Sequence, residues 1–129
     1  MSEQIGEIRV KVLGEEKIFG VENSQESFDE ALASIKEFLL EKMEDALGSD
    51  VGVLVKVEAS VRSLLTLEET PISSWSIEAQ NAREQRDFLG YNDTQAAEYF
   101  VGGYIGLATI FIASALNRLN QKYKPSRLQ

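Results

Sequence analysis

Residues 99–116 read YFVGGYIGLATIFIASAL, a run of eighteen residues without a charged side chain in a chain in which 26% of all residues are charged. A run of this length is close to the minimum that an α-helix needs to cross a bilayer. It also suits a helix that is buried in the core of a soluble protein. The placement of this run therefore decides both the fold and the class of function.

The apolar run is part of a longer predicted helix. Asn92 and Gln95 have the spacing of a capping box just before the run begins. Pro125 follows Lys124 at the other end, and proline cannot continue a helix. We therefore expect one long apolar C-terminal helix over residues 93–123.

Small residues lie together on one face of this predicted helix. They recur at steps of three or four residues and permit close approach of another helix; they are Gly102, Gly106, Thr109, Ala113 and Asn117. A glycine inside a helix costs up to about 1 kcal/mol relative to alanine. The glycines therefore indicate a close contact that offsets this cost, made either with another helix of the same chain or with a second copy.

Alternating patterns before residue 68 predict strands. Ile8, Val10 and Val12 alternate with charged residues, and a short second apolar run completes a hairpin over residues 6–21. Valine occupies nearly every second position from residue 51 to residue 61, and the same parity continues to residue 67. We expect the strand region 51–67 to be one bent strand or two strands joined near residues 60–63.

Two further helices are predicted between and after these strands. Apolar residues at helical spacing indicate a helix over residues 28–47, with Asn23, Ser24 and Ser27 as candidate N-caps. A second, weakly amphipathic helix is expected over residues 75–89.

These elements predict an α+β fold in a single domain that comprises residues 1–129. A small antiparallel sheet, formed by the hairpin 6–21 and the strand region 51–67, packs against helix 28–47 and the long apolar C-terminal helix 93–123. One sheet face can hardly bury both an amphipathic helix and a helix that is apolar all round. We therefore expect a homo-oligomer in which helix 93–123 packs against its counterpart.

Composition limits the possible chemistry. The chain contains no cysteine and no histidine, which removes thiolate metal sites, the commonest metal ligand and every Ser-His or Cys-His dyad. No phosphate loop, dinucleotide fingerprint, EF-hand or zincin motif is present. We therefore predict no catalytic residues, no metal site and no cofactor, and a carboxylate-based enzyme is only the third candidate.

Charge is distributed unevenly along the chain. Residues 1–98 contain all 21 acidic residues and nine basic ones, a net charge of −12, whereas residues 99–129 contain four basic residues and no acidic one. Because so acidic a body repels phosphate groups, we expect no nucleic acid partner. The polar, alternating N-terminus lacks the apolar run of a signal peptide, and we expect cytoplasmic residence.

The flanks of the apolar run keep a membrane interpretation open. Aromatic residues begin the run and basic residues follow it, as at the two edges of a membrane-spanning helix. However, basic residues that flank a transmembrane helix favour the cytoplasmic side of the membrane. In this chain that orientation would require the acidic body to cross the membrane. We favour a buried soluble helix, and a membrane anchor with a transmembrane helix near residues 99–116 remains the alternative.

Three groups of polar or aromatic residues are further candidates. The acidic patch Glu41, Glu44, Asp45 and Asp50 is expected either to face water or to bind a divalent cation or a basic partner. Trp75, Arg83 and Arg86 form either an interaction patch or the edge of the core. Glu98 is either a buried carboxylate or an ordinary first-turn residue that pairs with solvent or a nearby arginine.

Together these features favour a small non-enzymatic protein of interaction, assembly or regulation. Its expected partners are a second copy of itself and an unidentified protein. The alternatives are a small membrane-anchored protein with a cytosolic acidic domain and, third, a carboxylate-based enzyme.

Overall fold

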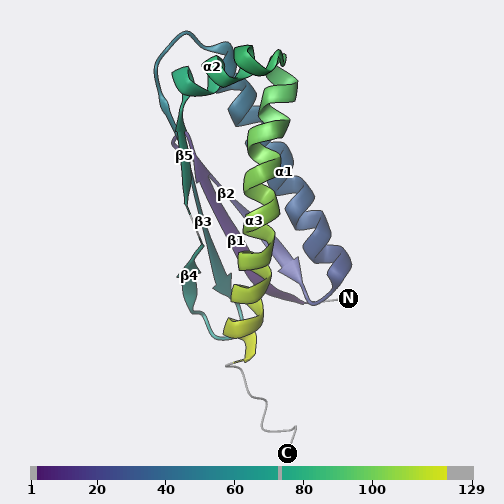
Figure 1. Cartoon of the computed structure of the whole chain (residues 1–129). Coiled ribbons are helices and arrows are strands. Elements are labelled where there is room, and N and C mark those ends of the chain that lie inside the picture. Colours follow the sequence, from purple (N-terminus) through teal and green to yellow (C-terminus); the bar gives the residue numbers. More distant parts are fainter. Residues whose placement is uncertain (1–2, 73, 122–129) are drawn as a thin grey trace, which may run out of the picture.

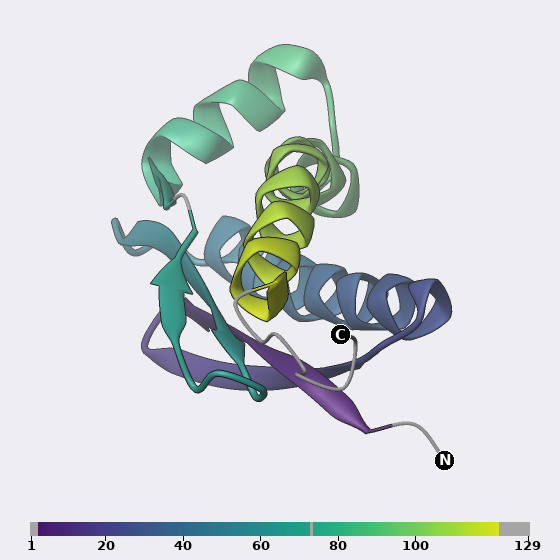
Figure 2. The same cartoon turned by 90° about the horizontal axis from the view of Figure 1, so that it is seen from below.

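The computed structural model describes residues 3–72 and 74–121. Its elements, in chain order, are β1 (Gln4–Val12), β2 (Glu15–Glu22), α1 (Gln25–Gly48), β3 (Leu54–Ser63), β4 (Glu69–Pro71), β5 (Trp75–Glu78), α2 (Ala79–Leu89) and α3 (Asp93–Gln121). The strands form one antiparallel sheet, and α1 and α3 lie side by side over one face of it (Figures 1 and 2). The predicted α+β fold is thus confirmed.

The predicted hairpin forms from β1 and β2. Leu13 and Gly14, the two residues between the strands, both have positive φ, of 51° and 79°. Positive φ at both central residues is the geometry that lets a two-residue turn follow the twist of its strands. Glycine adopts this conformation without strain, which explains its place in the turn.

The strand region predicted over residues 51–67 is shorter in the structure. β3 covers Leu54–Ser63 and pairs with β1, and the chain then turns back into β4. The Ser63 hydroxyl accepts hydrogen bonds from the backbone N–H groups of Leu65 and Thr66, both at 3.1 Å. This local capping ends the strand although the apolar parity continues to residue 67.

The prediction of a helix over residues 75–89 is wrong for the first four residues. Residues Trp75–Glu78 form strand β5, which pairs with β3 so that Trp75 lies opposite Val57. β4 and β5 thus share the outer edge of β3, giving the order β2-β1-β3 followed by these two short strands. Helix α2 begins only at Ala79, and Gly90 ends it with φ of 71°.

The helices start at polar caps. Ser24 caps α1 and accepts a hydrogen bond from the Ser27 backbone N–H, so α1 begins three residues before the predicted position 28. The predicted capping box of α3 is present: Asn92 N–H donates to Gln95 Oε1 at 3.0 Å, and Gln95 N–H donates to Asn92 Oδ1 at 2.8 Å. Of the predicted range 93–123, residues 122 and 123 lie outside the described residues.

One hydrophobic core joins the sheet to α1 and α3. The inward residues of β1 and β3 alternate, as the sequence predicted, and they are buried beneath the two helices. The buried residues of α3 are Ala96, Ala97, Phe100, Val101, Tyr104, Ala108, Ile112, Ala115, Leu116 and Leu119. One face of the apolar helix is therefore part of the core. The candidate functional site must be sought on its opposite face.

Candidate functional site

The outer face of α3 is apolar and exposed. Leu107, Ile110 and Phe111 are 65%, 66% and 51% exposed. Gly103 and Gly106 lie among them and are exposed as well, and these five residues define the outer face of α3. No charged residue occurs between Tyr99 and Asn117 to interrupt this face.

A groove of about 540 Å³ runs along one side of the outer face. Its walls come from α3 and from the start of β5, and its lining residues are Ser74, Trp75, Tyr99, Phe100, Gly103, Tyr104, Leu107 and Phe111. The Trp75 ring lies 6.3 Å from the ring of Phe100 and 6.2 Å from that of Tyr104, centroid to centroid. Aromatic contacts of this kind fix the wall of the groove in place.

The groove carries no charge at physiological pH. Burial raises the pKa of Tyr104 to about 12, because the low-polarity surroundings disfavour the phenolate. The remaining lining residues are aromatic, aliphatic, glycine or serine. The groove therefore suits an apolar or aromatic occupant.

The small-residue stripe predicted from the sequence lies beside this groove and is largely open. Gly106, Ala113 and Asn117 are exposed, and Gly102 and Thr109 are partly buried. A methyl group added at Gly102, Gly103 or Gly106 would meet no neighbouring atom within 4 Å. The glycines therefore do not accommodate another helix of the described chain. Contact with a second copy remains the open alternative.

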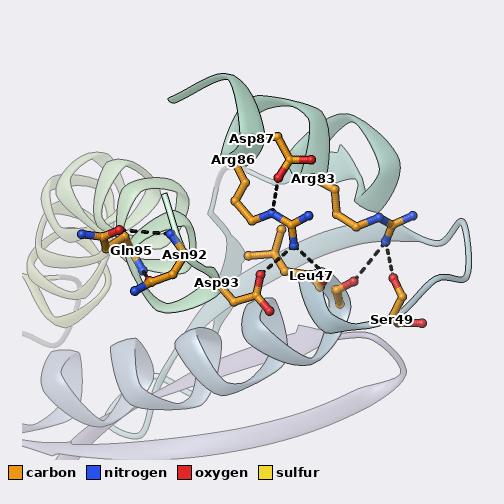
Figure 3. A network of polar contacts seen from close by, with 9 residues as sticks. Leu47, Ser49, Arg83, Arg86, Asp87, Asn92, Asp93 and Gln95 are labelled. Carbon is orange, nitrogen blue, oxygen red and sulfur yellow. Dashed lines mark hydrogen bonds and ion pairs between the residues drawn. The ribbon is translucent and has the colours of Figure 1, made fainter. Parts of the chain in front are cut away.

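Arg83 and Arg86 donate hydrogen bonds to backbone carbonyls of the same chain. Arg83 Nη1 donates to the carbonyl oxygens of Ala46, at 3.3 Å, and Ser49, at 2.5 Å, and Arg86 Nη1 donates to Leu47 O at 3.3 Å (Figure 3). These carbonyls belong to the C-terminal end of α1, whose last turn contains no basic residue. Arginines of α2 thus supply the positive charge that a helix C-terminus favours.

Arg86 also joins α2 to the start of α3. It forms ion pairs with Asp87 at 2.9 Å and Asp93 at 2.7 Å (Figure 3). Hydrogen bonds to Asp87 and then Asp93 hold the pKa of Arg86 above its usual range. Trp75, which the sequence grouped with the two arginines, contacts the rings of α3 instead.

The acidic candidates do not converge on a site among the described residues. Glu41, Asp45 and Asp50 are exposed and Glu44 is partly buried. Within residues 3–72 and 74–121, no group of three or more acidic residues is arranged to hold a metal ion. Glu98 pairs with Lys36 of α1, with 3.4 Å between Nζ and Oε2, rather than with an arginine.

The candidate residues predicted from the sequence do not include Gly103, Leu107, Ile110 and Phe111. Because the apolar run has no polar side, its periodicity could not show which face would turn outward. The spacing of residues 103, 107, 110 and 114 is one signal that could have found this face, because steps of four and three residues are typical of a face that packs against another helix.

Length and apolar character also distinguish α3. Among the described residues, it is the one helix that is long and apolar enough to cross a membrane, and 39% of its most apolar window is buried against the rest of the protein. Searches against protein-family models, curated proteins and solved structures gave no match. Function must therefore be inferred from the surface of α3.

Proposed function

We propose that this protein is a small non-enzymatic assembly protein that associates with itself through the outer face of α3. The observation that supports the proposal most directly is the exposure of Leu107, Ile110 and Phe111 on a helix whose opposite face is core. Isolated exposed apolar residues are normal at protein surfaces, but a contiguous patch marks an interaction site.

The patch has the composition of an interface centre. Charged residues are depleted there, and large aromatic side chains alternate with glycines that leave space for an opposing side chain. Covering a large apolar side chain such as Leu107 or Ile110 contributes roughly 1.5–3 kcal/mol if it becomes fully buried. Several such side chains on each of two copies give enough free energy to offset the entropy of association.

Self-association explains the patch with the fewest components. An unidentified protein could cover the same face with the same geometry. If that protein competes with a second copy of the chain for the face, a regulatory or assembly role follows. The acidic remainder of the chain, with a net charge of −12 over residues 1–98, keeps such an assembly soluble.

Membrane insertion of α3 is the second candidate, because α3 is long and apolar enough to span a bilayer. Insertion would require the helix to leave the sheet and α1. The apolar residues of the sheet and α1 that α3 covers would then lose their contacts with α3 and become exposed to water, at a cost of roughly 1.5–3 kcal/mol for each large side chain. Docking on a second copy retains these contacts, and we therefore favour it.

The test replaces Ile110 by glutamate. Burying an unpaired carboxylate at an interface is costly, so Ile110→Glu should raise the dissociation constant of the oligomer by at least about tenfold. The fold of the subunit should not change, because Ile110 is 66% exposed. Size-exclusion chromatography with light scattering measures the mass, and circular dichroism measures the fold.

Leu54→Glu is the matched control. Leu54 is 55% exposed and lies on the face of β3 that points away from the helices. This variant should keep the oligomeric mass of the unmodified protein. Loss of assembly in both variants, or in neither, contradicts the proposed interface.

Flotation with phosphatidylcholine vesicles tests the second candidate, membrane insertion of α3. A soluble assembly stays at the bottom of the gradient, whereas a protein inserted in the vesicles floats with them.

A further inference from the structure

The groove and the exposed phenylalanine of α3 are complementary features of one helix. Both Gly103 and Phe111 line the groove: Gly103 has no side chain to fill it, and the Phe111 side chain is 51% exposed. Both are four residues from Leu107, which places each about 6 Å from it along the helix axis. A two-fold axis at Leu107 would therefore put Gly103 of one copy opposite Phe111 of the other.

From this spacing we infer that two copies pair through antiparallel α3 helices, with Phe111 of each copy seated in the groove above Gly103 of its partner. The inference rests on the proposed self-association and specifies its geometry. A two-fold contact of this kind is self-complementary, because each copy supplies one groove and one ring. An aromatic anchor that fills a pocket is the usual centre of a stable interface.

The space above Gly103 can accept the ring. A methyl group built on Gly103 would meet no neighbouring atom within 4 Å, and Trp75 and Tyr99 provide aromatic walls. A phenylalanine ring packs well against such walls in an edge or offset arrangement.

Charge favours the antiparallel pairing over the parallel one. Arg118 is the charged residue nearest the C-terminal end of the described part of α3, and three more basic residues follow it in the sequence. Asp87 and Asp93 lie at the opposite end and pair there with Arg86 (Figure 3). Glu84 and Glu98 are also near that end, so its acidic residues outnumber Arg83 and Arg86. Antiparallel pairing brings the basic end of one copy to the acidic end of its partner.

A parallel pair would set the basic ends side by side. Arg118 would face the partner's Arg118, and the helix dipoles would point in the same direction. Like charges placed opposite each other are unfavourable, as are parallel dipoles at close range.

Disulfide trapping tests the geometry. The chain contains no cysteine, so Gly103→Cys and Phe111→Cys can be introduced singly into the full chain. The two variants are co-expressed with different affinity tags and oxidised mildly. Antiparallel pairing predicts a mixed disulfide between Gly103→Cys and Phe111→Cys as the main product, because bridged Cα atoms lie about 4.4–6.8 Å apart.

Controls make every outcome decisive. Leu107→Cys, at the axis, should link to itself, and Leu54→Cys, on the far face of the sheet, should not link. A main product in which each of Gly103→Cys and Phe111→Cys links to its own kind would overturn the antiparallel geometry and leave self-association intact. A chain that remains monomeric in the same preparation overturns the proposed function itself. Dimers that none of the α3 cysteines can trap overturn both.

A second measurement avoids introduced cysteines. Phe111→Ala should raise the dissociation constant at least about tenfold, because it removes the ring from the partner's groove. Phe88→Ala, at an 89% exposed phenylalanine on α2, is the control and should leave that constant within about twofold. Equal effects of the two substitutions would contradict the role of Phe111.

Discussion

Among single residues, Arg83 and Arg86 supply the positive charge that the C-terminal end of α1 lacks. Acidic residues crowd that end, although a helix C-terminus favours positive charge. The two arginines come from α2 and donate to the carbonyls of residues 46, 47 and 49 (Figure 3). The sequence predicts an interaction patch or the edge of the core for these arginines and not this capping, because their acceptors lie 34 to 39 positions away.

This capping predicts a stability effect. Arg83→Met keeps the aliphatic length and removes both hydrogen bonds to α1, so the free energy of unfolding should fall by roughly 1–3 kcal/mol. Urea unfolding followed by circular dichroism measures it. Arg62→Met, which removes a positive charge from the outer face of β3, is the control and should change stability by less than about 0.5 kcal/mol. Equal effects of the two substitutions would show that the contacts to α1 contribute nothing.

Among the helices and strands, the sequence was most informative where a local pattern coincides with local chemistry. The hairpin, β3 and the Asn92–Gln95 capping box are all encoded by neighbouring residues and were predicted. β5 was missed because four residues carry too short a pattern, and its pairing with β3 is tertiary. The sequence singled out Gly106 of the exposed face of α3 but not its large apolar residues, since burial by α1 and the sheet selects the inner face.

The glycines of α3 provide a prediction about this helix. Gly106→Ala should raise the stability of the isolated subunit by up to about 1 kcal/mol, because alanine favours the helix and the added methyl group meets no neighbour. The same substitution should weaken assembly, because it fills space at the proposed interface. Unfolding is measured on the monomeric Ile110→Glu background, and assembly on the otherwise unmodified chain. A substitution that stabilises the subunit without weakening assembly would remove Gly106 from the interface.

In the molecule as a whole, the fold gives α3 one buried face and one exposed face. The inner face completes the core that the sheet and α1 begin (Figure 2). The outer face has no covering element among the described residues, and within α3 the acidic residues Asp93 and Glu98 precede the apolar run whereas Arg118 follows it. We propose that pairing of two copies buries the apolar face and brings the opposite charges together.

Coverage of the outer face of α3 by a second copy of the chain can be tested on the unmodified protein. Sedimentation equilibrium in detergent-free buffer, over a range of concentrations, gives the mass of the species in solution. Self-association predicts a mass at least twice the 14.4 kDa of one chain, with dissociation only on dilution. A single species of 14.4 kDa at every concentration would contradict it.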